Sequence, residues 1–281
     1  MGLNLRSFGT RTISALFFVV LMLGSLGWSY FSFTVFFLFV ALGSLHEFFV
    51  MMRHMGLRPF TIAGFASALF LYLLFVDLSW ISPLLNQHTL LPLALLLPGV
   101  IATASVFRAK NEPVNEAIFT TAGIIYCVLP FALLHLIVLN NNGIGSYSAV
   151  RLLGVILLIW SNDTFAYLSG NFFGKNKMVE RISPGKTWEG TAGGLLITFA
   201  LSFIIRNQLI GGTGPLWPIL GIVVPVMATI GDLVQSMLKR KAGVKDSGTI
   251  MPGHGGLLDR FDSLIFVSPF VVVLFLLLEL N

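Results

Sequence analysis

Long apolar segments alternate with short polar ones along most of this 281-residue chain. A helix that crosses a lipid bilayer needs about 20 mainly apolar residues. The segments that come close to this length lie at roughly 11–27, 30–51, 62–82, 89–106, 117–139, 149–170, 188–206, 215–238 and 261–280. The pattern therefore predicts an all-α integral membrane protein with about nine transmembrane helices. The segment Met1–Gly27 resembles a signal peptide but lacks a convincing cleavage site, so we interpret it as a retained first helix.

The composition also indicates a membrane protein. Hydrophobic residues make up 56% of the chain and charged residues 10%, whereas soluble domains average about 45–50% and about 25%. Cys127 is the only cysteine, which excludes a disulfide framework within the chain and cysteine-rich metal sites. The formal net charge of +5 does not predict a nucleic-acid partner, because the basic residues are dispersed among the loops between apolar segments.

The basic residues predict the orientation in the membrane. If the N-terminus is cytoplasmic, fifteen of the 17 Lys and Arg residues fall on the cytoplasmic side, and only Arg151 and Arg206 fall on the other. Cytoplasmic loops carry such an excess in membrane proteins. We therefore expect a cytoplasmic N-terminus and a C-terminus on the outer side. The compact length and the lack of a transit segment favour a bacterial plasma membrane.

Charge is concentrated in Gly231–Asp262, which contains nine of the 29 formal charges and lies between two long apolar runs. Ionisable groups at membrane depth are costly and indicate a functional site. In the predicted orientation the carboxylates gather at the cytoplasmic level, whereas a transporter would place them near the midplane or in both leaflets. We expect an interfacial enzyme whose active site faces the cytoplasm. Within one continuous membrane domain, 1–150 would serve as scaffold, dimerisation surface or lipid access, and 151–281 would be catalytic.

Three carboxylates of this segment have the chemistry of a metal site. Asp232 shares a helix face with Ser236 and Lys239, and Asp259 shares one with Asp262. Acidic side chains without Cys or clustered His suit Mg²⁺ or Mn²⁺, which prefer oxygen ligands and often bridge to phosphate. The alternative is that these acids form internal salt bridges with neighbouring Lys and Arg side chains.

Two glycine-containing segments have features of anion sites. His254, Gly255 and Gly256 follow Pro252-Gly253, so the backbone can adopt positive φ and approach a ligand closely, although a plain turn explains the same pattern. Ser183–Gly190 contains Gly-Lys-Thr, as a P-loop does, but Glu180 replaces a required glycine and we expect no strand before it. The alternative for this second segment is an ordinary helix cap, with Thr187 as the cap and Glu189 in the first turn.

Polar residues also interrupt two predicted helices. Asn162 and Asp163 lie in an otherwise apolar helix, and we expect Asp163 to face cations or a metal, unless it forms a structural pair with Tyr167. His46 and Glu47 lie near the cytoplasmic end of the second helix. We interpret them as a helix-packing pair in preference to a distant support for the site.

The charged segment has the pattern Ser236-x2-Lys239-Arg240-x4-Lys245-Asp246-x7-His254-Gly255-Gly256-x2-Asp259-Arg260-x-Asp262. This pattern resembles the signature of the CDP-diglyceride synthetase (phosphatidate cytidylyltransferase) family. Gly231-Asp232, the Ser183–Gly190 segment and Asn162-Asp163 also look like that family. The resemblance covers about residues 155–270.

The resemblance implies a Mg²⁺-dependent transfer of CMP from CTP to phosphatidic acid, which gives CDP-diacylglycerol and pyrophosphate for phospholipid biosynthesis. It implies metal ligands at Asp232, Asp259, Asp262 and Asp163, and a homodimer in the membrane lipid. The catalytic residues that it implies are Asp232, Asp259, Lys239, Arg240, Lys245, Asp246 and His254. The substrate-binding residues that it implies are Ser183, Lys186, Thr187, Glu189, Ser236, Gly255, Gly256, Arg260 and Asn162.

Two alternatives remain open at this point. A CTP-dependent transferase or kinase that acts on another lipid, such as an isoprenoid, would need much the same charges. A phosphate or cation transporter would instead spread its carboxylates across the depth of the membrane. The absence of GxSxG, HExxH and paired CxxC motifs gives a lipase or a zinc metalloprotease little support.

Overall fold

The computed structural model describes residues 5–77, 93, 96–108, 113–139, 147–211, 213–250 and 255–278. The side chains of 5–13, 108 and 113 are left out of the description. Within the described residues the chain is almost entirely helical and has one two-stranded sheet. The all-α prediction is therefore confirmed.

The elements follow the predicted apolar segments closely. The helices are α1 (Leu5–Trp28), α2 (Tyr30–His54), α3 (Thr61–Phe75), α5 (Leu97–Arg108), α6 (Pro113–Cys127), α7 (Leu129–Leu133), α8 (His135–Val138), α9 (Val150–Phe173), α10 (Trp188–Ile205), the π-helical turn η4 (Arg206–Ile210), α11 (Leu216–Ala242) and α12 (Leu258–Leu278). The strands are β1 (Lys177–Val179) and β2 (Ser183–Thr187).

Among the described residues, six helical stretches are long and apolar enough to cross a membrane. They are Tyr30–His54, Val114–Val138, Val150–Phe173, Trp188–Ile210, Leu216–Ala242 and Leu258–Leu278. Ser14–Trp28, Thr61–Phe75 and Leu97–Phe107 are apolar but shorter. Each of the nine predicted spans thus contains a helix, and the six long ones support an integral membrane protein. The count of nine crossings and the orientation of the termini remain predictions.

The chain divides into two compact units, which are described separately. The first contains the described parts of Met1–His135, Gly143–Tyr147 and Lys241–Phe261. The second contains those of Leu136–Asn142, Ser148–Arg240 and Asp262–Asn281. This grouping rests on packing and does not test the predicted functional division at residue 150.

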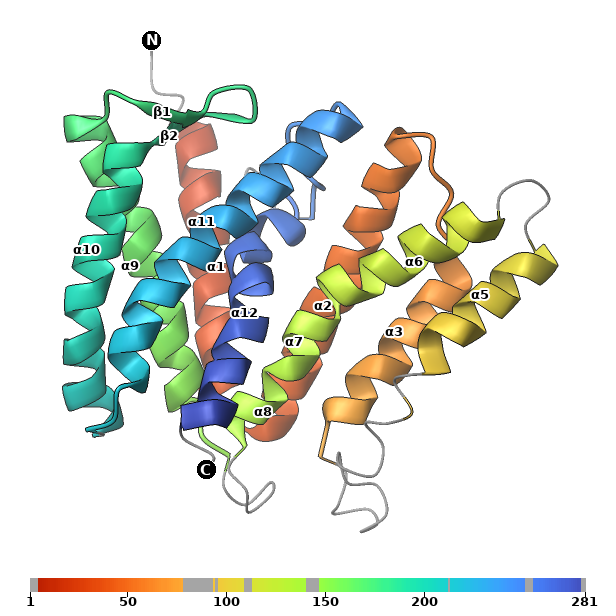
Figure 1. Cartoon of the computed structure of the whole chain (residues 1–281), viewed down its shortest axis with the longest axis horizontal. Helices are drawn as coiled ribbons and strands as arrows, with labels where there is room; N and C mark the ends of the chain where they lie inside the picture. The colour runs from red at the N-terminus through yellow and green to blue at the C-terminus, as the bar shows by residue number, and fades with distance from the viewer. Residues whose placement is uncertain are drawn as a thin grey trace. The chain divides into compact units, whose positions relative to one another are not determined.

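In the first unit, α2 contacts α1, α3, α6 and α7 (Figure 1). Its Phe33, Phe37 and Phe49 side chains are fully buried, which removes large apolar areas from water or lipid. A capping box starts the helix: the Ser29 hydroxyl accepts from Ser32 N–H at 3.1 Å, and the Ser32 hydroxyl accepts from Ser29 N–H at 3.0 Å. The helix that carries His46 and Glu47 is therefore firmly anchored in this unit.

In the second unit, α9 and α10 lie side by side and the β1–β2 hairpin joins them at one end (Figure 1). Glycines allow the close approach of the two helices. A β-carbon added at Gly190 would lie 2.7 Å from the carbonyl oxygen of Ala166, and one at Gly194 would lie 2.8 Å from Oδ1 of Asn162. The pairing of these helices fixes the position of Asn162 and Asp163 relative to the hairpin.

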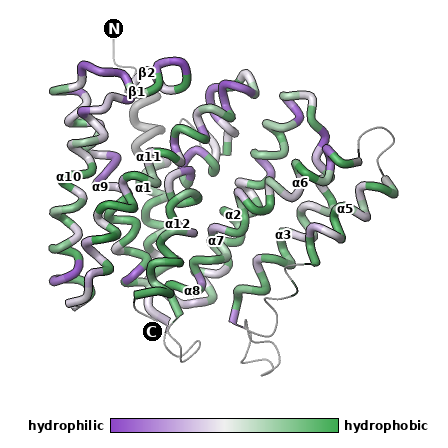
Figure 2. The backbone as a smooth tube through the Cα atoms, viewed as in Figure 1, coloured by the Kyte–Doolittle hydropathy of each residue, from purple (hydrophilic) through white to green (hydrophobic). Residues whose placement is uncertain are grey.

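The hairpin corrects one expectation. We expected no strand before Ser183, but Lys177–Val179 pairs antiparallel with Ser183–Thr187, with Lys177 opposite Thr187 and Val179 opposite Ser183. The expectation was wrong because the three-residue strand has too few residues for an alternating pattern. The P-loop is still excluded by Glu180. Figure 2 shows hydrophilic residues at the hairpin and in the last turns of α11, whereas the middle of α10 is mainly hydrophobic.

Candidate active site

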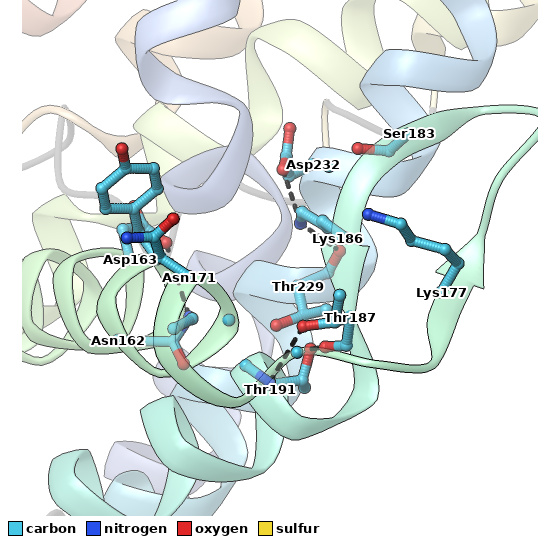
Figure 3. A pocket seen from close by; sticks show the side chains of 16 residues that line it. Asn162, Asp163, Asn171, Lys177, Ser183, Lys186, Thr187, Thr191, Thr229 and Asp232 are labelled. Carbon is cyan, nitrogen blue, oxygen red and sulfur yellow. Dashed lines mark hydrogen bonds and ion pairs between the residues drawn. The ribbon is translucent and has the colours of Figure 1, made fainter.

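A pocket of about 510 Å³ lies in the second unit, lined by residues of α9, the hairpin, α10 and α11 (Figure 3). Its volume falls within the range of about 300–1,000 Å³ that is typical of small-molecule sites. It brings together six residues that the sequence singled out: Asn162, Asp163, Ser183, Lys186, Thr187 and Asp232. These residues are spread over seventy positions of the chain, so the fold is what assembles them.

Lys186 and Asp232 form an ion pair in this pocket. Nζ of Lys186 lies 2.5 Å from Oδ2 of Asp232, and it also donates to the carbonyl oxygen of Thr229 at 3.4 Å. The two side chains are 25% and 35% exposed, so water reaches both and screens their attraction. A cation from β2 and an anion from α11 thus face the same space, where an incoming phosphate or metal would meet both.

Asp163 provides a second carboxylate in the pocket, on α9. Asp163, Asp232 and Asp262 interact electrostatically, with Lys186 and Lys239 as nearby opposing charges. Asp262 is buried and accepts from the N–H of Ser263 at 2.7 Å, and it does not line the pocket. Like charges held near one another are costly, so this arrangement favours the binding of a cation.

Asn162 has an unsatisfied oxygen beside these acids. Its side chain is 2% exposed, and its Nδ2 donates to Oδ1 of Asp163 at 3.4 Å. Its own Oδ1 is buried and finds no hydrogen-bond donor among the described residues. A buried unpaired oxygen costs about 1–3 kcal/mol. A ligand or water that donates a hydrogen bond there would recover that energy.

The sequence left two roles open for the segment around Thr187, an anion site and a helix cap, and the structure is compatible with both. Thr187 is the N-cap of α10, and its hydroxyl accepts from the N–H of Gly190 at 3.2 Å. Glu189 does not line the pocket; its carboxylate accepts from the N–H groups of Lys175 and Asn176 at 3.1–3.2 Å and from Nδ2 of Asn176 at 2.6 Å. Glu189 therefore holds the turn that leads into β1, while Lys186 faces the pocket.

A divalent cation fits part of the predicted ligand set. Among the described residues, no group of three or more His, Cys, Asp and Glu side chains is placed to hold a metal. Mg²⁺, however, is usually held by one or two carboxylates together with substrate phosphates and water. Asp163 and Asp232, which both line the pocket, provide that donor chemistry.

The glycine-containing turn lies in the first unit. Oδ2 of Asp259 accepts from the N–H of Ser247 at 2.7 Å and from the N–H of Gly256 at 3.2 Å. Gly255 has φ +84°, which confirms the positive φ expected there. His254 lies outside the described residues. The carboxylate that we predicted as a metal ligand thus also organises the backbone around it.

The other predicted site residues lie outside the pocket. Nε of Arg240 donates to the carbonyl oxygen of Ile182 at 3.4 Å, which ties α11 to the hairpin. Ser236 is half-buried on α11. In the first unit, Lys245, Asp246 and Arg260 are exposed.

Sequence reasoning missed two kinds of site residue. Lys177 and Asn171 line the pocket, and Figure 3 shows Lys177 on the hairpin beside Ser183. The undetected hairpin is the reason that Lys177 was overlooked.

Glu47 is the second case, because we considered it as a support for the site but preferred a packing role. It is 2% exposed, and its carboxylate accepts from the Ser247 hydroxyl at 2.8 Å and from the N–H groups of Leu257 and Leu258 at 2.9 Å. His46 stacks on the ring of Phe65 of α3, which fits the predicted packing role, whereas the hydrogen bonds of Glu47 fit the support role that was also considered. A lone acid in an apolar helix was the available indication.

The model of the cytidylyltransferase family matches residues 9–278. A phosphatidate cytidylyltransferase of Haemophilus influenzae is 39% identical over 194 residues, which are 66% of this chain and 66% of that protein. The enzyme of the same name from Bacillus subtilis is 33% identical over 240 residues, 84% of this chain and 87% of that protein. One from Staphylococcus aureus is 43% identical over 129 residues, 44% of this chain and 48% of that protein.

Proposed function

Because this chain belongs to the cytidylyltransferase family, we propose that it transfers CMP from CTP to phosphatidic acid. The products are CDP-diacylglycerol and pyrophosphate, and the protein would act in phospholipid biosynthesis. The relatives that carry the name phosphatidate cytidylyltransferase support this assignment. The observation that carries it within the structure is the pocket in which Lys186, Asp232 and Asp163 face one space.

The chemistry joins two anions. An oxygen of the phosphatidate phosphate attacks the α-phosphorus of CTP, a new P–O bond forms, and the bond from the α-phosphorus to the bridging oxygen of the β-phosphate breaks. The electron pair of that bond leaves with pyrophosphate. Because the nucleophile is already anionic, we propose no covalent enzyme intermediate and no general base.

In this proposal Lys186 and Lys177 bind phosphate oxygens and lower the repulsion between the two substrates. Thr187 and Ser183 place the hairpin at the start of α10, where the N-terminal end of a helix favours anions. Asn162 offers its unpaired Oδ1 to a donor of the nucleotide or to bound water. Lys239, Arg240 and Lys245 remain proposed phosphate contacts, as the family resemblance implies. The turn at Gly255-Gly256 remains a proposed nucleotide contact, and Arg260 a proposed substrate-binding residue.

We propose Mg²⁺ as the cofactor, with Mn²⁺ as a substitute. Asp232 and Asp163 would hold it, with Asp262 and Asp259 as further proposed ligands. When bound, the metal would stabilise negative charge that develops on the phosphate oxygens. Lys186 would then exchange its contact with Asp232 for contact with phosphate.

We further propose that the protein lies in a bacterial inner membrane with its site facing the cytoplasm, where CTP is available. The bacterial relatives and the distribution of basic residues support this location. A homodimer is proposed from the family resemblance alone. Cysteine labelling at loops on either side of the membrane would test the orientation, and the mass of the detergent-solubilised protein would test the dimer.

The decisive experiment uses purified protein in detergent with Mg²⁺, phosphatidic acid and CTP labelled at either the α- or the γ-phosphate. We expect the α-label to enter the lipid and the γ-label to leave in pyrophosphate. Asp232→Asn should abolish transfer, whereas Glu180→Gln, which removes an exposed hairpin carboxylate away from the pocket, should leave it intact.

Two other results would contradict the proposal. Entry of the γ-label into the lipid would identify a kinase. Label that appears only when an isoprenoid phosphate replaces phosphatidic acid would identify a transferase with another acceptor. If wild-type protein that is shown to be folded labels none of these lipids, counterflow of phosphate across sealed vesicles would test the transporter alternative.

A further inference from the structure

We propose that Glu47 is a positioning residue for the reaction, which holds the segment Lys241–Phe261 in the conformation that catalysis requires. This inference rests on the proposed function, because that segment carries Asp246, Gly255 and Asp259. Glu47 lies on α2, far from this segment in the sequence. Both are part of the first unit.

Glu47 is buried and makes several direct hydrogen bonds to this segment. Its carboxylate is buried and receives three hydrogen bonds, from the hydroxyl of Ser247 at 2.8 Å and from the N–H groups of Leu257 and Leu258 at 2.9 Å each. Hydrogen bonds to ionised acceptors are about twice as strong as neutral ones. Leu257 and Leu258 lie where α12 begins, so Glu47 also satisfies N–H groups that the helix leaves without a partner.

The segment packs directly on this carboxylate. A β-carbon added at Gly248 would overlap with the Glu47 carboxylate, and so would one added at Gly256. One added at Gly43, on the same face of α2, would overlap with the Leu257 side chain. Glycine at these three positions lets the backbone close around Glu47. Any other side chain would push the segment away from α2.

Glu47 and Asp259 hold the same residue from two sides. The Ser247 hydroxyl donates to Oε2 of Glu47, and the Ser247 N–H donates to Oδ2 of Asp259. Asp259 also accepts from the N–H of Gly256, which lies against Glu47. Loss of Glu47 would release Ser247 and the start of α12 together, so the Asp259 carboxylate would lose its fixed orientation.

The test compares Glu47→Gln with Ser44→Ala in the full-length protein. The glutamine keeps the size of the side chain but offers one acceptor oxygen in place of two. Ser44 lies one turn earlier on α2, is fully buried, and its hydroxyl has no hydrogen-bond partner among the described residues. Both variants disturb the interior of the same helix, but of these two side chains only that of Glu47 has hydrogen bonds to the segment among the described residues.

We expect Glu47→Gln to lower kcat by about 10- to 100-fold, as loss of a group that orients catalytic ligands does, and to raise the Mg²⁺ concentration needed for half-maximal activity. Ser44→Ala should keep wild-type values. Glu47→Asp should recover part of the lost rate, because it restores the charge. A folded Glu47→Gln protein with wild-type kcat and Mg²⁺ dependence would overturn the proposal. The proposal would also be overturned if the activity of Glu47→Gln fell only in proportion to the amount of folded protein.

A measurement that does not depend on enzyme activity separates this inference from the proposed function. Hydrogen exchange at the amides of Ser247, Leu257 and Leu258 should become faster in Glu47→Gln and stay unchanged in Ser44→Ala. If wild-type protein transfers no CMP but the exchange result holds, the proposed function fails, and the finding that Glu47 holds the segment stands. If wild-type protein is active and the exchange in Glu47→Gln is unchanged, the positioning role proposed for Glu47 is wrong.

Discussion

Nζ of Lys186 on the hairpin contacts Oδ2 of Asp232 on α11 at 2.5 Å. If this pair serves catalysis, each partner has its own ligand in the bound state, phosphate for the lysine and metal for the aspartate. We expect Lys186→Met to lower kcat by about 10²–10³-fold, as the loss of one group that stabilises transition-state charge does. Initial rates of labelled CDP-diacylglycerol formation measure this.

A charge-swapped protein distinguishes this role from a structural one. In Lys186→Asp combined with Asp232→Lys, the ion pair can form again with the opposite polarity. We expect the double variant to stay inactive, because phosphate would meet an anion and the metal a cation. Recovery of activity in the double variant would mean that the pair only holds the hairpin to α11.

Removal of the divalent cation should abolish activity. Excess EDTA is expected to stop CMP transfer, and added Mg²⁺ or Mn²⁺ to restore it, because oxygen ligands and phosphates suit these ions. Asp163→Asn should raise the Mg²⁺ concentration that gives half-maximal activity, since one of the two pocket carboxylates is lost. Full activity in EDTA would show that Lys and Arg side chains neutralise the phosphates without a metal.

Gly194→Ala should destabilise the protein. The added β-carbon would lie 2.8 Å from Oδ1 of Asn162 and 2.9 Å from Cβ of Ala166, closer than such atoms pack. Overpacking of this kind costs about 1–3 kcal/mol, so thermal unfolding in detergent should begin at a lower temperature. Gly185→Ala is the matched control, because a β-carbon there meets no atom within 4 Å. Equal stability of the two variants would mean that α9 and α10 can move apart at Gly194 without a cost in folding free energy.

Glu189→Gln should loosen the turn between α9 and β1. The carboxylate accepts from the N–H groups of Lys175 and Asn176, and a glutamine cannot accept from both as strongly. Hydrogen exchange at these two amides should become faster, and CMP transfer should slow because Ser183 and Lys186 lie on the same hairpin. Glu180→Gln, on the exposed hairpin tip, should change neither quantity.

The helices could be predicted from the sequence because an apolar run of sufficient length is a local property. Each predicted span contains a helix among the described residues, and the six longest meet the length of a membrane crossing. The hairpin could not be predicted in the same way. Its second strand contains Pro184 and Gly185, which are rare in strands, and its first strand has only three residues.

Individual residues of the candidate site were predicted from the sequence, but the contacts between them were not. Lys186 and Asp232 were expected to bind phosphate and metal, yet nothing in their spacing indicates that they touch. Thr187 as a helix cap was one of two open alternatives, and the structure confirms it. The rule that a lone ionisable residue in an apolar helix indicates function was applied to Asp163 and not to Glu47, which is why we preferred a packing role for Glu47.

One wall of the pocket is made of backbone. Gly170, Gly174 and Gly190 all line it, and a β-carbon at any of them would press on Thr187, on Gly170 or on the carbonyl oxygen of Ala166. An inhibitor shaped to this wall would meet atoms that point mutation can hardly change, since any larger residue there damages the enzyme before it displaces the drug. Resistance would arise more readily at lining residues whose side chains can be exchanged, such as Lys177, Asn171 and Tyr167.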